Sequence, residues 1–168
     1  MTPPALTVDE LRTIGLFGAV GDDTLQFLVG RLTVTTPAPG NVVFQEGDVA
    51  RDLFIVMNGE MEVLKRSRSG VDARVALLGP GDWFGEMSIL DVQPRSATVR
   101  VLAPSRLVRV GAADLDALYR HDLKGYALIV LNVARELSRR LRVADGLLAD
   151  FVANVMGQYV SQRRRSAS

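Results

Sequence analysis

Three residues between positions 82 and 99 have the properties needed to hold a phosphorylated sugar. Gly85 lets the backbone come close to a ligand because glycine has no Cβ atom. Glu86 can only accept hydrogen bonds, which suits sugar hydroxyls, whereas Arg95 offers a planar fork of donors that matches a phosphate. The apolar run 87–90 predicts a helical turn whose free N–H groups would favour an anion. One small anion that carries a ribose would satisfy all of these groups.

The stretch 84–99 reads FGEMSILDVQPRSATV. It closely resembles the phosphate-binding cassette of the cyclic nucleotide-binding domain, a family that includes bacterial catabolite activators, cyclic-nucleotide-dependent kinases and gated ion channels. The turn glycines also resemble those of the family's β-roll, so that the resemblance covers about residues 6–148. From the residues alone, the alternative is an ion pair between Glu86 and Arg95 that only pins a loop. The resemblance implies a ligand, cAMP or cGMP, and contacts to it from Phe84, Gly85, Glu86, Met87, Ser88, Arg95, Ser96 and Ala97.

The resemblance also implies a role for each part of this cassette. Arg95 is expected to pair with the equatorial phosphate oxygens, with help from backbone N–H groups around Ser88 and Ala97. Glu86 and the backbone of Gly85 are expected to hold the ribose 2′-hydroxyl. The side chains expected to line the base and sugar pocket are Val75, Leu77 and Phe84.

The identity of the base depends on two further positions. Ser96 stands where a threonine tends to accompany cGMP in the kinases and channels, and cAMP-responsive activators have serine there. Those activators place a Thr-Ser pair against adenine where this chain has Ala144 and Asp145. Asp145 can accept from the adenine amino group or from a guanine edge, or it is a solvent-facing helix residue. We expect cAMP first and cGMP second, with no cofactor and no metal.

Composition narrows the class of protein. The 168 residues suffice for one domain with a core, and a net charge of +1 gives no bulk attraction to nucleic acid or membrane. The absence of cysteine removes disulfides, iron–sulfur clusters and thiolate metal sites. With one histidine, His121, which we expect at a helix start, the chain offers no catalytic constellation. Residues 1–10 lack signal-peptide features and no apolar stretch could span a bilayer, so we expect a cytoplasmic protein that is not an enzyme.

The spacing of turns predicts an α+β fold, an antiparallel jelly-roll-like β-roll flanked by N-terminal helices and a long C-terminal helix. Asn58-Gly59 is a strong hairpin signal, and short β-rich runs at even spacing suggest a sandwich or jelly roll. The glycine-rich run 79–85 fits neither a P-loop nor a dinucleotide fingerprint. The strands are expected at 41–45, 53–57, 61–65, 74–78, 98–102 and 106–110.

Three segments are predicted from these patterns. Residues 1–32 form a helical segment, in which Thr7 and Glu10 make a capping box and Asp22 or Asp23 caps a second helix. Residues 33–110 form the β-roll, with the phosphate-binding cassette at 84–99. Residues 111–168 form the C-terminal helices, with roles as a lid and in dimerisation, and a basic polar tail. In this last segment we expect a short helix at 114–119 and a long one capped by Asp122.

The long helix carries an apolar seam with alternating spacings of four and three residues, which is a heptad pattern. By resemblance to the activators, we expect this seam to form a parallel homodimer, the alternative being that it packs on the β-roll. Gly146 lies inside the helix, where a kink or break is conceivable because glycine costs about 1 kcal/mol relative to alanine. The seam consists of Val130, Ala134, Leu137, Leu141, Ala144, Leu148, Phe151 and Val155.

Two classes of function follow. The activators continue into a helix-turn-helix module, whereas only eleven residues follow Gly157 here, so we expect no DNA binding by this chain. The first class is a regulatory sensor that passes the binding signal through its C-terminal helix to an unknown downstream protein. The second is a β-roll module that binds another effector or none and acts by dimerisation. The intact trio Gly85, Glu86 and Arg95 favours the first.

Overall fold

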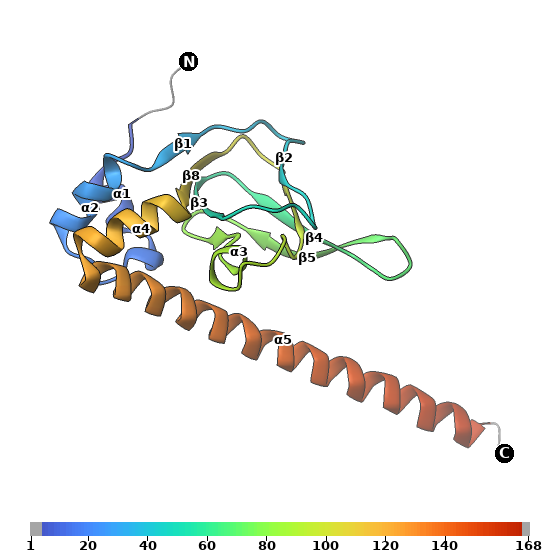
Figure 1. Cartoon of the computed structure of the whole chain (residues 1–168). Coiled ribbons are helices and arrows are strands. Elements are labelled where there is room, and N and C mark those ends of the chain that lie inside the picture. Colours follow the sequence, from blue (N-terminus) through green and yellow to red (C-terminus); the bar gives the residue numbers. More distant parts are fainter. Residues whose placement is uncertain (1–4, 166–168) are drawn as a thin grey trace. The chain divides into compact units, whose positions relative to one another are not determined.

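The computed structural model describes residues 5–165, with side chains described for residues 5–157. The chain divides into two compact units, Met1–Asn132 and Val133–Ser168, which are described separately below. The first unit holds the N-terminal helices and all strands of the described part. The second consists of the greater part of one long helix (Figure 1).

The β-roll in the first unit consists of two four-stranded antiparallel sheets. All six predicted strands are present, whereas β1 (Thr33–Thr35) and β6 (Trp83–Phe84) were not predicted as strands. One sheet has the order β1 (Thr33–Thr35), β8 (Arg106–Gly111), β3 (Asp52–Asn58) and β6 (Trp83–Phe84). The other has the order β2 (Val42–Phe44), β7 (Thr98–Val101), β4 (Met61–Arg66) and β5 (Asp72–Leu78). The predicted fold class is thereby confirmed.

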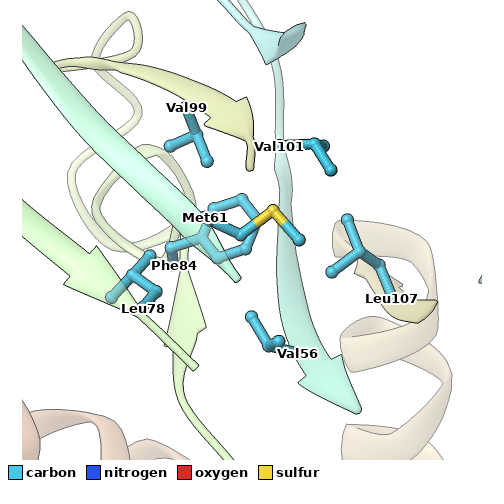
Figure 2. Close-up of a cluster of buried hydrophobic side chains, with 7 residues drawn as sticks. All are labelled: Val56, Met61, Leu78, Phe84, Val99, Val101 and Leu107. Carbon is cyan, nitrogen blue, oxygen red and sulfur yellow. The ribbon is translucent and has the colours of Figure 1, made fainter. Parts of the chain in front are cut away.

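A hydrophobic core fills the space between the sheets (Figure 2). Successive side chains of a strand point to opposite faces, so alternate residues such as Val99 and Val101 of β7 face this core. The partly buried side chains of Phe44, Phe54 and Val63 pack against it. The buried members come from both sheets: Val56, Met61, Leu78, Phe84, Val99, Val101 and Leu107.

The N-terminal segment forms α1 (Val8–Arg12), the 3-10 turn η1 (Gly15–Phe17) and α2 (Asp22–Val29). The predicted capping box is present, because the Thr7 side chain accepts from the Glu10 N–H and the Glu10 carboxylate accepts from the Thr7 N–H. The predicted cap of α2 is wrong. Gly21 is its N-cap, and Asp22 and Asp23 occupy the first turn, where negative charge suits the helix dipole.

The remaining helices are α3 (Met87–Leu90), α4 (Ala112–His121) and α5 (Leu123–Arg165). The helices α1, α2 and α4 gather at the end of β8 (Figure 1). His121 ends α4 and stacks on Phe27 with ring centroids 4.0 Å apart, so its expected place at a helix start was wrong. Asp122 precedes α5 and accepts from the backbone of Gly125, as a cap does.

The helix α5 continues through Gly146 without a break, so the predicted kink is absent. The last turn of α5 includes residues 163–165, which were expected in a polar tail. The side chains of these residues lie outside the described part of the chain, as do residues 166–168. No helix in the described chain is long and apolar enough to cross a membrane.

Candidate functional site

The predicted cassette is a loop and one helical turn that join β6 to β7. Gly85 follows β6 with a φ of +86°, a conformation that glycine adopts readily and other residues rarely do. A Cβ atom at this position would lie 2.6 Å from Nη1 of Arg95 and 3.1 Å from the carbonyl oxygen of Asp52. The close approach that requires glycine is therefore an approach to Arg95 within the protein itself.

Arg95 is the centre of this site. Its side chain is only 3% exposed, and Nη1 donates to the carbonyl oxygens of Asp52 (2.7 Å) and Gly85 (2.9 Å) and to Oγ of Ser88 (3.3 Å). Nη2 donates to Oδ1 of Asp52. The guanidinium also lies over the ring of Phe44, 4.0 Å from its centroid, which is a cation–π contact. Five contacts thus hold one buried cation.

Asp52 is the carboxylate that pairs with Arg95, and sequence reasoning missed it. It is the first residue of β3, and its second oxygen, Oδ2, accepts from Nε of Arg109 at 2.5 Å. The pairing of β3 with β8 places Arg109 opposite Phe54, within reach of Asp52. The expected alternative, in which Glu86 pins Arg95, is replaced by this pair. No spacing rule could have linked Asp52 to a residue 43 positions away.

Burial and charge act in opposite directions on Arg95. Burial lowers the pKa of its guanidinium below the ordinary value, and the negative charges of Asp52, Asp48 and Glu86 raise it. Arginine remains protonated in proteins, so the site holds a desolvated positive charge. Such a charge is tolerable only with a hydrogen-bonded partner, and Asp52 supplies it.

One edge of the Arg95 guanidinium has unused donors. Nε is buried and has no hydrogen-bond partner among the described residues, and Nη2 makes one of its two possible bonds. Nε and Nη2 point two N–H groups in the same direction, which is the fork that binds two oxygens of a carboxylate or phosphate. A hollow of about 320 Å³ adjoins Arg95 and Asp52, with Phe44 and Phe54 in its wall.

The structure brings most of the other cassette residues together around Arg95. Glu86 and Ser88 are buried, at 4% and 2% exposure, while Met87 and Ser96 are exposed. Oγ of Ser96 lies 3.6 Å from Sδ of Met87. Ala97 is half-buried just before β7.

Of the residues expected to line the pocket, one is buried in the core and another lies on the face of its sheet that is turned away from the core. The side chain of Phe84 is 4% exposed and belongs to the core between the sheets (Figure 2), so it has a packing role. Leu77 is paired with Glu62, on the face of the sheet opposite to the core, which Val63 faces. Contacts of Phe84 and Leu77 with a ligand remain predictions.

Val75 and Asp145 are both exposed. Val75 lies at a bulge in β5, between residues paired with Val63 and Leu64, and is 60% exposed. Asp145 is an exposed residue of α5 in the second unit. Contacts of either residue with a base remain predictions. No group of three or more acidic, histidine or cysteine side chains among the described residues is arranged to hold a metal ion.

Comparison with known proteins decides the family. The family model "Cyclic nucleotide-binding domain" matches residues 36–122, a range that contains the cassette together with Asp52 and Arg109. The chain belongs to the cyclic nucleotide-binding domain family. Its sequence is 31% identical over 157 residues to a CRP-like cAMP-activated global transcriptional regulator of Mycobacterium tuberculosis, covering 92% of this chain and 68% of that one.

Two further similarities involve Thermus thermophilus. The cyclic AMP receptor protein of this organism is 37% identical over 110 residues, covering 63% of this chain and 47% of that protein. The crystal structure of its catabolite activator protein superimposes with a TM-score of 0.72 at 31% identity, covering 83% of this chain and 63% of that one. This member of the family thus spans about half to two thirds of the length of these relatives.

Proposed function

We propose that this chain is a regulatory protein that binds a cyclic nucleotide, with cAMP as its ligand. The observation that carries the proposal is the unused edge of Arg95, a buried cation whose Nε has no partner among the described residues. A cyclic phosphate presents two oxygens and one negative charge to that edge. The charge-assisted bonds it would form contribute roughly 1.5–3 kcal/mol each.

The other cassette residues complete the proposed site. Backbone N–H groups around Ser88 and Ala97 assist at the phosphate, and Glu86 with the Gly85 backbone holds the ribose 2′-hydroxyl. Glu86 is buried at the start of the cassette helix, and its carboxylate can accept a hydrogen bond from a sugar hydroxyl. Met87 and Ser96 lie on the exposed side of the cassette, and Val75 and Asp145 are proposed to contact the base.

The printed names of two relatives support cAMP over cGMP. Both the Thermus receptor and the mycobacterial regulator are described by their response to cAMP. Ser96 also favours cAMP over cGMP, because the threonine that is associated with cGMP would occupy this position. We propose cGMP as the second ligand, with weaker binding.

The proposed output is a change in the C-terminal helix, in a homodimer that forms through the heptad seam in the cytoplasm. A ligand shifts a conformational equilibrium only through contacts that differ between the two states. The cassette is the element that gains such contacts on binding. An unidentified downstream protein would read the change, and neither catalysis nor DNA binding by this chain is proposed.

Isothermal titration of nucleotide-stripped protein with cAMP and then cGMP tests the proposal. We expect micromolar or tighter binding of cAMP. Arg95→Ala should weaken it about a hundredfold or more, equivalent to about 2.7 kcal/mol. Arg100→Ala is the matched control, because Arg100, like Arg95, donates to a buried carboxylate, in this case Glu62 at 2.6 Å.

If neither nucleotide binds, the proposal is wrong, and the alternative of a module that binds another effector or none is favoured. Binding of cAMP by Arg95→Ala within threefold of the unmodified protein would remove Arg95 from the phosphate site. Circular dichroism of each variant checks that the loss of the buried cation has left the fold intact.

A further inference from the structure

Asp52 is a buried carboxylate held between two arginines. Oδ1 accepts from Nη2 of Arg95, and Oδ2 accepts from Nε of Arg109 at 2.5 Å. Its backbone carbonyl accepts from Nη1 of Arg95 at 2.7 Å as well. Asp52 therefore holds the Arg95 guanidinium by side chain and backbone at once.

Asp52 binds the guanidinium through its two terminal nitrogens, Nη1 and Nη2, and not through Nε. The acceptors from Asp52 lie at Nη1 and Nη2, and Gly85 and Ser88 also accept from Nη1. All four bonds are thus made by Nη1 and Nη2, whereas Nε has no partner among the described residues and Nη2 has one acceptor for its two N–H groups. Asp52 does not occupy the place of a phosphate. It fixes the plane in which the open edge lies.

The charges of these three residues suit an anion at Arg95. Two arginines and one aspartate sum to one positive charge, while Asp48 and Glu86 add negative charge around Arg95, and a cyclic phosphate diester brings one negative charge to the guanidinium itself. Without Asp52, Arg95 would be a desolvated cation with only neutral acceptors and with a second arginine close by, an arrangement that costs stability.

We propose that Asp52 is the positioning residue of the phosphate site, which orients Arg95 for a cyclic phosphate diester, and that Arg109 in turn holds Asp52. The inference rests on the proposed function, because it assigns phosphate binding to Arg95. Arg109 acts on Arg95 only through Asp52, and its side chain is 47% exposed. Its contribution to cAMP affinity should therefore be smaller than that of Asp52.

The test is titration with cAMP of Asp52→Asn, Arg109→Gln and the matching double variants with Arg95→Lys. Asp52→Asn keeps shape and removes charge, and should weaken binding about tenfold, or about 1.4 kcal/mol. Arg109→Gln should weaken it about threefold and, because Arg109 is half-exposed, should leave the fold intact. In the Arg95→Lys background, Asp52→Asn should change affinity less than twofold, because the group that it positions is gone.

Glu62 offers matched controls. It is buried at 4% and shared between Arg74 and Arg100, on the face of its sheet away from the core. Glu62→Gln and Arg100→Gln therefore remove the same kind of ion pair outside the site. Both should leave cAMP affinity within twofold even where they lower the melting temperature. Equal losses in the Glu62 and Asp52 variants would reduce Asp52 to a structural role and overturn the inference.

A spectroscopic readout tests the hold on Arg95 without any ligand. In ¹⁵N spectra of the unliganded protein, the two Nη groups of Arg95 should give separate signals, because the four end-on bonds stop rotation about Cζ–Nε. In Asp52→Asn the signals should broaden or merge. Unchanged signals, or binding by Asp52→Asn within twofold of the unmodified protein, would overturn the inference. If the unmodified protein binds neither nucleotide, the proposed function fails, whereas the signals of Arg95 still decide whether Asp52 holds it.

Discussion

Gly85 is the residue on which the geometry of the cassette depends most directly. Its φ of +86° turns the chain from β6 into the cassette, and the position of its missing side chain is filled by Arg95 and by the carbonyl of Asp52. The same atom that would collide with a Cβ, Nη1 of Arg95, donates a hydrogen bond to the Gly85 carbonyl oxygen at 2.9 Å. Glycine at this position thus allows both the left-handed turn and the close approach of the Arg95 guanidinium.

We predict that Gly85→Ala lowers both stability and cAMP affinity. The left-handed backbone alone costs an L-residue roughly 1–2 kcal/mol, and displacement of Arg95 adds to this. Urea denaturation should therefore show a loss of more than about 1 kcal/mol. Titration should show binding weakened at least tenfold, because a shifted Arg95 no longer presents its open edge.

Gly79→Ala is the control for this substitution. Gly79 lies six residues earlier, has no positive φ, and a Cβ there would meet nothing within 4 Å. We expect its stability to stay within about 0.5 kcal/mol of the unmodified protein. A Gly85→Ala variant as stable as Gly79→Ala would show that the cassette relaxes around the added atom.

At the scale of elements, polar contacts join the N-terminal segment to the β-roll and to the start of α5. Glu10 of α1 accepts from Arg106 of β8 at 2.5 Å. The Asn132 side chain, buried in α5, donates to the carbonyls of Leu16 and Gly18 at 3.0 Å each. These contacts join residues 96 to 116 positions apart, so the three elements form one body within the first unit.

The Glu10–Arg106 pair predicts a pH dependence of stability. The Arg106 hydrogen bond holds the pKa of Glu10 below its ordinary value. A carboxyl whose pKa is lower in the folded protein contributes stability that is present above its unfolded pKa, about 4.3, and is lost as the pH falls through the folded value. We expect Glu10→Gln to lower the melting temperature at pH 7, and we expect this loss to shrink as the pH falls below about 4.3, as measured by thermal denaturation.

Asp116→Asn provides the comparison. Asp116 pairs with Arg120 at 2.8 Å on the exposed face of α4, and such surface pairs contribute little. Its melting temperature should match that of the unmodified protein throughout. A Glu10→Gln variant that behaves like Asp116→Asn would show that solvent screens the link between α1 and β8.

At the scale of the whole molecule, the heptad seam of α5 is an exposed apolar surface suited to bind a second helix. Leu141, Leu148 and Phe151 are 62%, 60% and 65% exposed in the single chain. Arg140 and Asp145 flank the seam five residues apart, the spacing at which opposite charges of two parallel helices meet. Apolar exposure and charge spacing together favour the proposed parallel homodimer.

We predict that Ala144→Lys abolishes this dimer. Ala144 lies on the seam and is exposed in the single chain, and a parallel dimer would bring two lysines together in an apolar contact. Sedimentation equilibrium should give the mass of a dimer for the unmodified protein and of a monomer for this variant.

Ala153→Lys makes the same chemical change at an exposed position of α5 on the opposite side of the heptad. It should remain dimeric. If both variants dissociate, helix propensity and not the seam controls assembly, and if neither does, the dimer forms elsewhere.

The sequence by itself determined most of the elements and the cassette. Strand positions followed from turn residues such as Asn58-Gly59, and the start of α1 followed from the capping box of Thr7 and Glu10. The cassette was recognisable because its residues lie within sixteen consecutive positions. All of these are local features, set by backbone preferences and by hydrogen bonds between near neighbours.

Only the tertiary structure decided which residues surround Arg95. Asp52 contacts Arg95 from 43 positions away in the sequence, and Arg109 reaches Asp52 because β3 pairs with β8, a register that depends on contacts distant in sequence. In the same way, the pairing of Leu77 with Glu62 places the Leu77 side chain on the face of the sheet away from the core. The packing of α4 against α2 stacks His121 on Phe27. Burial and register are properties of the assembled sheets, so no single segment encodes them.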